Sequence, residues 1–263
     1  MTAAPAPRRS DLPIRAVTGL VLILVALFCI VYGKTPFWAL LTAAALMMLA
    51  EWASLIRAER WQMWIAFVGM LPPLILCNYH LDVTNAAPWL CLIATTLAVF
   101  TFTRLPRLAA GMLYAGLPAL ALFYIQGQYD GVDLAFWTLA IVWATDIGAY
   151  FIGRKIGGPK LAPVLSPNKT WAGLIGGTVA AIIAGIALAH ILHLPLRLAA
   201  FSGLLALAAQ AGDIYESAMK RRAGVKDSGR LLPGHGGVMD RLDGVVPVAC
   251  IVALIVSSGV LTA

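Results

Sequence analysis

Nine long apolar stretches constrain the fold of this chain more than any other feature of its sequence. They run approximately over Ala16–Tyr32, Phe37–Ile56, Trp61–Cys77, Trp89–Phe102, Ala110–Ile125, Leu134–Ile152, Ala172–Leu192, Leu198–Ser217 and Val245–Leu261. Crossing a membrane takes about 20 helical residues, and the fourth and fifth stretches are short by that measure. Lipid offers the backbone no hydrogen-bond partners, so spanning segments are expected to be helices. Only 12% of the residues are charged, about half the share of a soluble domain. We therefore predict an all-α integral membrane protein with about nine transmembrane helices.

The basic residues predict how these helices are oriented. With a cytoplasmic N-terminus, 17 of the 19 Lys and Arg residues lie on the cytoplasmic side, and only Lys34 and Arg197 lie opposite. This agrees with the positive-inside rule, and removing or adding one span would spoil it. The net charge of +7 then has three interpretations: an ordinary basic rim, attraction to anionic membrane lipids, or binding of a polyphosphate substrate. A nucleic-acid partner is not expected, because the chain has no soluble basic domain.

The chain divides unevenly into two parts. Residues 1–133 hold five of the stretches and few charges, which indicates a scaffold or a lipid pocket. Residues 134–263 hold the other stretches and two cytoplasmic segments, 153–170 and 220–241, both rich in Gly, Pro, Lys and Arg. We therefore expect the functional site in the second part, facing the cytoplasm.

Acidic side chains inside or beside the apolar stretches predict a metal site. Asp146 lies in the sixth stretch, and Asp213 and Glu216 lie three residues apart near the end of the eighth, on one helix face. Asp240 and Asp243 are again three apart, where the ninth stretch begins. Helix capping would explain one of these aspartates, and pairing with a nearby Lys or Arg is the alternative for Glu216. Converging carboxylates repel one another unless cations lie between them, and hard oxygen ligands suit Mg²⁺.

Residues suited to phosphate surround these acids. The segment between the two acidic pairs is basic, and its glycines free the backbone to form an anion-binding concavity around His235. The other segment offers polar side chains at a helix start, although Walker A spacing is missing. The residues expected to contact substrate are Ser166, Asn168, Lys169, Thr170, Lys220, Arg221, His235, Gly236, Gly237 and Arg241. Together the residues predict a metal-assisted phosphate site at a cytoplasmic membrane surface.

Two motifs resemble one enzyme family. The stretch from Ser217 to Asp243, which includes Pro-Gly-His-Gly-Gly-Val-Met-Asp-Arg-Leu-Asp, closely resembles the signature of the phosphatidate cytidylyltransferases, also called CDP-diacylglycerol synthases. Residues Ser166 to Gly173 resemble a second family motif, with Ala172 where the family commonly has Glu. The strong resemblance covers about residues 143–243, whereas the N-terminal half is similar only as a run of spans.

The resemblance implies a reaction and roles for individual residues. CTP and phosphatidate would give CDP-diacylglycerol and pyrophosphate, with Mg²⁺ and with room for a second metal ion. Asp213 and Asp240 would be metal ligands, with Asp243 and Asp146 as neighbours. Lys226, Asp227 and His235 would lie at the nucleotide, and the catalytic set would be Asp213, Asp240, Lys226, Asp227 and Asp243. The family resemblance also implies a homodimer, and a bacterial inner membrane is the expected location.

Two other functions stay open at this point. A CTP-dependent polyprenol-type lipid kinase would transfer the γ-phosphoryl group and release CDP. An ion-coupled transporter would use Asp146, Asp213 and Glu216 as coupling residues, although these acids lie toward one face and no inverted repeat is evident.

Overall fold

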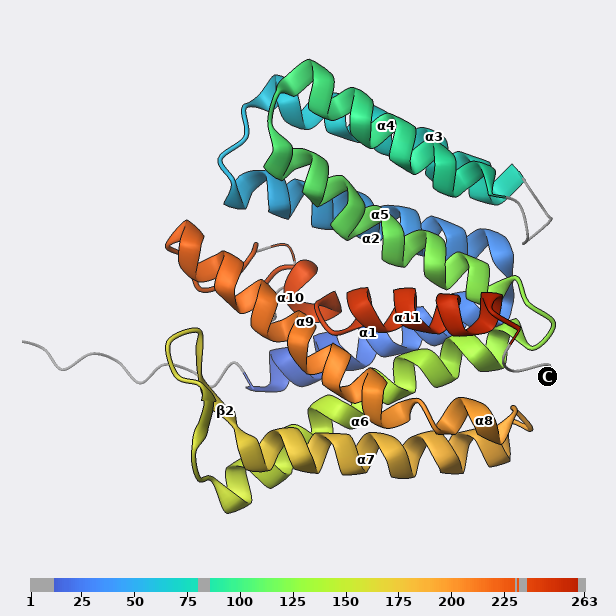
Figure 1. Cartoon of the computed structure of the whole chain (residues 1–263), viewed down its shortest axis with the longest axis vertical. Coiled ribbons are helices and arrows are strands. Elements are labelled where there is room, and N and C mark those ends of the chain that lie inside the picture. Colours follow the sequence, from blue (N-terminus) through green and yellow to red (C-terminus); the bar gives the residue numbers. More distant parts are fainter. Residues whose placement is uncertain (1–11, 80–85, 230, 232–235, 260–263) are drawn as a thin grey trace, which may run out of the picture.

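Long helices build almost the whole of the computed structural model, which describes residues 12–79, 86–229, 231 and 236–259 (Figure 1). The long helices are α1 (Leu12–Tyr32), α2 (Lys34–Leu55), α3 (Arg60–Tyr79), α4 (Ala87–Thr103), α5 (Pro106–Gln126), α6 (Gly131–Ile156), α7 (Trp171–Ile191), α9 (Ser202–Ala223) and α11 (Val245–Ser257). Two four-residue helices, α8 (Leu196–Ala199) and α10 (Met239–Leu242), complete the helical part of the described chain.

Each apolar stretch of the sequence overlaps one long helix, and the eighth, Leu198–Ser217, begins in the short helix α8 before it continues into α9. Within the described residues, α2, α3, α5, α6 and α7 are long and apolar enough to cross a membrane. Helices α4 and α11, and the described part of α1, are apolar but shorter. The prediction of a helical membrane protein is confirmed at this level.

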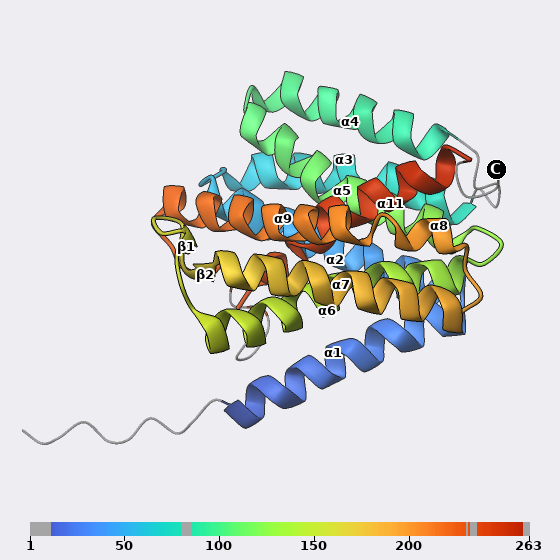
Figure 2. The same ribbon diagram turned by 60° about the horizontal axis from the view of Figure 1, so that its bottom comes forward.

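The helices are arranged in three groups. In Figure 1 the pair α3–α4 forms one flank and the pair α6–α7 forms the other, while α2, α5, α9 and α11 lie between them. Turning the molecule shows α1 along the α6–α7 side, where it packs against α2 and α6 (Figure 2). The largest buried side chains include Phe37, Leu49, Met112, Leu120 and Trp137, so the core runs through the middle group and onto α6.

A small hairpin was not foreseen in the sequence. Strands β1 (Lys160–Ala162) and β2 (Ser166–Thr170) pair antiparallel between α6 and α7. The residues from Ser166 to Thr170, expected at a helix start, are therefore a strand, and α7 begins directly after them. Thr170 still acts as the helix cap, because its Oγ1 accepts a hydrogen bond of 3.0 Å from the Gly173 N–H.

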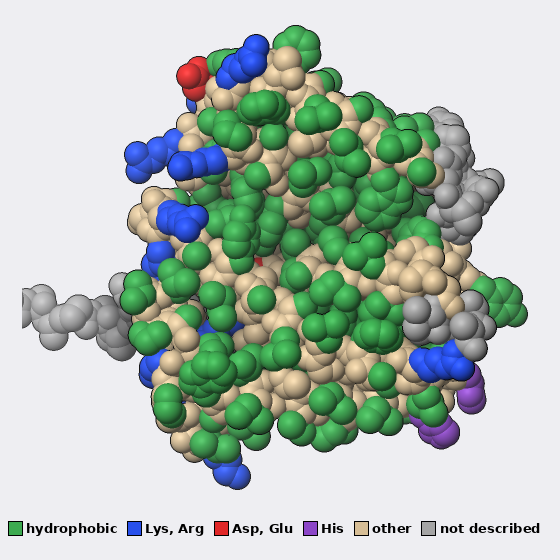
Figure 3. Space-filling model, in the orientation of Figure 1, with side chains coloured by type: hydrophobic (Ala, Val, Ile, Leu, Met, Phe, Trp, Pro, Cys, Tyr) green, Lys and Arg blue, Asp and Glu red, His purple; other side chains and the backbone are tan. Residues whose placement is uncertain are grey.

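Most basic side chains gather at one end of the bundle. Figure 3 shows Lys and Arg along the left-hand edge of the molecule, with apolar side chains covering the middle. The α2–α3 and α4–α5 connections, the hairpin and the end of α9 lie at this end, and α10 lies further in, beside α9 (Figure 1). We call it the basic end.

Small residues let α6 and α7 approach closely. A Cβ atom on Gly148 would lie 2.5 Å from the Ala180 Cβ and 2.9 Å from the Gly176 carbonyl oxygen. A Cβ on Gly177 would lie 2.7 Å from the carbonyl oxygen of Thr145. Membrane helices commonly pack through such small residues, because close backbones gain van der Waals contact. Close packing of α6 against α7 therefore fixes the position of Asp146 on α6 relative to the β1–β2 hairpin that joins the two helices.

Replacing Gly177 by alanine tests this packing. The added methyl group meets backbone of α6, so we expect Gly177→Ala to lose about 1–3 kcal/mol of stability, the usual cost of overpacking. The matched control is Gly203→Ala in α9, whose Cβ would approach the Ile182 Cδ1 to an ordinary 3.4 Å. Unfolding in detergent micelles measures both variants, and equal midpoints would contradict the packing argument.

Candidate active site

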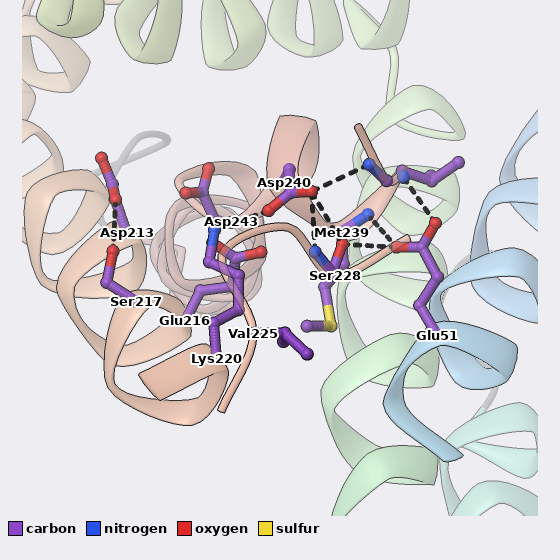
Figure 4. Close-up of polar contacts among 12 residues, drawn as sticks. Glu51, Asp213, Glu216, Ser217, Lys220, Val225, Ser228, Met239, Asp240 and Asp243 are labelled. Atoms are coloured by element: carbon purple, nitrogen blue, oxygen red, sulfur yellow. Dashed lines mark hydrogen bonds and ion pairs between the residues drawn. The ribbon is translucent and has the colours of Figure 1, made fainter. Parts of the chain in front are cut away.

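Three carboxylates converge at the basic end. Asp213 and Glu216 come from α9, and Asp243 comes from the turn between α10 and α11 (Figure 4). One oxygen atom of each lies within 4.8 Å of the others. We call Asp213, Glu216 and Asp243 the acidic triad. The structure thus brings together two acids of the eighth apolar stretch, Asp213 and Glu216, and one acid that precedes the ninth, Asp243.

The acidic triad has the donor chemistry of a metal site. Glu216 is 1% exposed, and although its Oε2 lies 2.6 Å from the Lys220 Nζ, its buried Oε1 has no hydrogen-bond partner. A buried carboxylate oxygen without a partner is costly, and a cation among three carboxylates would supply one. The residues present therefore fit a divalent ion such as Mg²⁺.

The electrostatics of Asp243 point the same way. Its Oδ1 accepts a 2.8 Å hydrogen bond from the Gly244 N–H. Burial, and then the negative charge of Asp213, nevertheless raise the pKa of Asp243 to about 7. A cation beside this carboxyl group would favour its ionised form.

Asp213 is linked to the hairpin segment. The Lys169 Nζ lies 2.5 Å from the Asp213 Oδ2 and donates a 3.0 Å hydrogen bond to the Gln210 Oε1. Asp146 is exposed on α6 and lies within electrostatic range of Asp213 and Lys169. The two polar segments of the sequence therefore meet at α9, as expected for parts of one site.

Asp240 lies beside the acidic triad rather than in it. Its Oδ1 is 2.5 Å from the Lys220 Nζ. Its Oδ2 accepts hydrogen bonds from the Ser228 N–H (2.9 Å), the Ser228 hydroxyl (3.0 Å) and the Gly237 N–H (2.8 Å). Burial alone would raise the pKa of Asp240, but the Lys220 ammonium, followed by the side chain of Glu216 and the Gly237 N–H, holds this pKa below its ordinary value.

Glu51 was missed in the sequence and belongs to the same network. It lies on α2, is 4% exposed, and faces Ser228 and Met239 (Figure 4). It accepts hydrogen bonds of 2.8 Å from the Ser228 hydroxyl and from the Val238 and Met239 N–H groups. It stands in the second apolar stretch, so the rule that singled out Asp146 would have found it.

The other expected substrate residues lie around this centre. Ser166 is half-buried, whereas Asn168, Lys226, Asp227 and Arg241 are exposed. Arg221 donates hydrogen bonds to the carbonyl oxygens of Leu165 (3.4 Å) and Val225 (3.3 Å), which joins the hairpin to the end of α9. Gly236 has a φ of +83°, which favours glycine. His235 lies outside the described residues.

The fold and the acidic triad are those of a helical membrane protein with a charged, metal-type site among its helices. The chain belongs to the cytidylyltransferase family, whose model matches residues 13–258. It is therefore a nucleotidyltransferase, and the resemblance of its motifs is confirmed at the level of the family.

Named relatives agree with this assignment. The chain is 39% identical over 256 residues to the phosphatidate cytidylyltransferase of Brucella suis, covering 93% of each chain. It is 33% identical over 255 residues to the protein of that name from Bacillus subtilis, covering 89% of this chain and 93% of the relative. The Staphylococcus aureus protein of that name is 36% identical over 176 residues, or 60% of this chain and 68% of the relative.

Removing the Lys220 ammonium tests how the site is held. Lys220→Met leaves Glu216 and Asp240 facing each other without their shared cation, and breaking a buried ion pair typically costs about 3–5 kcal/mol. We expect a clearly lower unfolding midpoint in detergent micelles. Lys226→Met, an exposed lysine on the same segment, is the control, with an expected change within about 0.5 kcal/mol. Equal stability of the two variants would show that Lys220 does not hold the site.

Proposed function

We propose that this enzyme is a phosphatidate cytidylyltransferase, which converts CTP and phosphatidate into CDP-diacylglycerol and pyrophosphate. The observation that carries the proposal is the acidic triad flanked by Lys169 and Lys220 at the basic end of a membrane-helix bundle. The names of the Brucella and Bacillus relatives supply the substrate pair. A lipid substrate also accounts for the fold, because its headgroup can reach the site while its acyl chains stay in hydrocarbon.

The membrane arrangement is part of the proposal. We propose that α1 to α7, α9 and α11 make nine spans, that the N-terminus and the basic end face the cytoplasm, and that the membrane is a bacterial inner membrane. The one-sided distribution of Lys and Arg supports this orientation. We also propose a homodimer, with residues 1–133 as scaffold or lipid pocket and residues 134–263 carrying catalysis.

The reaction needs charge neutralisation more than it needs a base. The second pKa of a phosphate monoester is about 6, so phosphatidate is largely ionised near pH 7. We propose that one of its phosphate oxygens attacks the α-phosphorus of CTP in line, forming a P–O bond as the bond to pyrophosphate breaks. Both substrates are anions, and the approach is favoured by positive charge near the phosphates.

The residues divide this work between them. Asp213, Glu216 and Asp243 would hold Mg²⁺, which when bound supplies positive charge to the phosphates of CTP. Asp146 and Asp240 are proposed neighbours of that centre or ligands of a second ion, and Asp240 would have to exchange Lys220 for an ion at Oδ1.

Basic and polar groups around the centre would bind the substrates. We assign Arg221, Lys226 and Arg241 to phosphate groups because arginine and lysine pair with phosphate oxygens. Asp227, His235, Gly236 and Gly237 are assigned to the nucleotide, and Ser166, Asn168, Lys169 and Thr170 to the second substrate-binding segment.

The fate of labelled phosphorus tests the reaction. With CTP labelled at the α-phosphorus, we expect label in a lipid product, and with γ-label we expect it in pyrophosphate. A lipid kinase would instead place γ-label in the lipid and release CDP. Ion-coupled flux into vesicles without nucleotide, in place of product, would indicate a transporter. The measurement uses purified protein, phosphatidate and Mg²⁺, with a reaction lacking phosphatidate as the control.

The metal dependence tests the role of the acidic triad. Asp243→Asn removes a charged ligand, so we expect the Mg²⁺ concentration for half-maximal activity to rise at least about tenfold, or about 1.4 kcal/mol in binding free energy. Asp130→Asn, in the exposed turn before α6, is the control and should match the wild type. Chelation by EDTA should abolish turnover, and Mg²⁺ should restore it. An unchanged midpoint in Asp243→Asn would remove Asp243 from the metal site.

A further inference from the structure

We propose that Glu51 is a positioning residue for cytidylyl transfer: from the N-terminal half of the chain it fixes the backbone that carries Asp240, and Asp240 in turn contacts Lys220. This inference rests on the proposed function for its kinetic part. Its structural part is independent, because it concerns contacts within the protein.

Three consecutive N–H groups are divided between two carboxylates. The Gly237 N–H donates to the Asp240 Oδ2, the Val238 N–H to the Glu51 Oε1 and the Met239 N–H to the Glu51 Oε2, each at 2.8 Å. Glu51 therefore holds the two residues that directly precede Asp240 in the chain. A shift of this backbone would move Asp240 with it.

The Ser228 hydroxyl joins the two carboxylates. It lies 2.8 Å from the Glu51 Oε2 and 3.0 Å from the Asp240 Oδ2, and its single proton is shared between them. Ser228 and Val238 flank residues 229–237, which we call the glycine-rich segment, so Glu51 on α2 contacts the chain on both sides of this segment. We call these contacts the Glu51 clamp: Glu51 with Ser228, Val238 and Met239.

The Glu51 clamp leaves no room for a side chain at two glycine positions, Gly229 and Gly237. A Cβ on Gly237 would collide with the Ser228 Oγ and the Glu51 Oε2, and a Cβ on Gly229 would lie 2.5 Å from the Glu51 Oε1. Neither glycine has a positive φ. Close approach of the Glu51 carboxylate, rather than backbone conformation, therefore explains why these positions need glycine.

The clamp reaches the acidic triad through charged contacts. Asp240 lies 2.5 Å from the Lys220 Nζ, and Lys220 lies 2.6 Å from the Glu216 Oε2. Each step is a short contact with a charged group, which fixes geometry better than a neutral one. A carboxylate that is 4% exposed is costly unless several donors satisfy it, so the clamp forms as a unit. Glu51 thus acts on the reaction through Asp240 and Lys220.

Glu51→Gln is the variant that tests the clamp. The amide keeps the shape but has one acceptor oxygen and an NH₂ donor, so Val238 and Met239 cannot both keep their bonds. Ser228→Ala removes only the shared hydroxyl and serves if Glu51→Gln folds poorly. Leu49→Ala is the matched control, because Leu49 is fully buried on the same helix and lies in the apolar core.

Hydrogen–deuterium exchange of purified protein in detergent is the first measurement. We expect amide exchange in residues 236–242 to become at least about tenfold faster in Glu51→Gln, and faster to a smaller extent in Ser228→Ala. Leu49→Ala should lower the unfolding midpoint while leaving these amides protected. Unchanged exchange in Glu51→Gln would overturn the clamp. Hydrogen exchange needs no turnover, so this test of the clamp is independent of enzyme activity. If the wild type forms no CDP-diacylglycerol, the proposed function is overturned, but the exchange result still tests the clamp.

Steady-state kinetics then separate positioning from stability. We expect the KM for CTP to rise about tenfold in Glu51→Gln, while the KM for phosphatidate changes less than twofold. A residue that only stabilises the fold would lower the active fraction, so the apparent kcat would fall with both KM values unchanged, as expected for Leu49→Ala. That pattern in Glu51→Gln would overturn the positioning role.

Discussion

The ammonium group of Lys220 lies between two carboxylates that would otherwise repel each other, and the arrangement of the basic end depends on it. Glu216, on one side of Lys220, belongs to the acidic triad. Asp240, on the other side, accepts hydrogen bonds from the Ser228 and Gly237 N–H groups at the two ends of the glycine-rich segment. Because neither carboxylate is well exposed, water cannot screen them as it does at a surface. Lys220 therefore couples the metal-type site to the segment assigned to the nucleotide.

Negative charge nevertheless outweighs the lysines in this region. Lys169 and Lys220 contact Asp213, Glu216 and Asp240, whereas Asp243 is stabilised by a backbone N–H and has a raised pKa. The imbalance is what an ion-binding site requires, since full pairing with lysine would leave no ligand for a metal. Because of this excess negative charge, the affinity of the site for a cation would depend on the hydrogen bonds and ion pairs that position each carboxylate.

Much of this arrangement could be predicted from the sequence, because a lipid environment requires apolar helical segments and makes acids inside them costly. Apolar length predicted the helices, and acids in or beside apolar stretches marked Asp146, Asp213, Glu216, Asp240 and Asp243. The expected metal ligands included Asp240 and Asp146 but not Glu216, whereas the structure groups Asp213, Glu216 and Asp243. The equal spacing of Asp240 and Asp243 did not reveal their different partners, because those partners come from other segments: Asp240 contacts Lys220 and Ser228, whereas Asp243 lies near Asp213 and Glu216. The β1–β2 hairpin left no signal in a short polar segment rich in Gly and Pro. Glu51 could have been singled out as an acid inside the second apolar stretch, but its partners Ser228, Val238 and Met239 could not, because they lie 177 to 188 residues away in sequence.

The Glu51 clamp also joins residues that the ribosome makes at very different times. Glu51 precedes Ser228 by 177 residues and Met239 by 188. At about 5–20 residues per second, the ribosome needs roughly 10–40 s to deliver those partners. During that interval the Glu51 carboxylate lacks the donors that satisfy it when it is buried, so α2 cannot reach its final packing before they are made. The segment that leads into α10 thus completes the packing of α2, because it supplies hydrogen-bond donors that the buried Glu51 carboxylate needs.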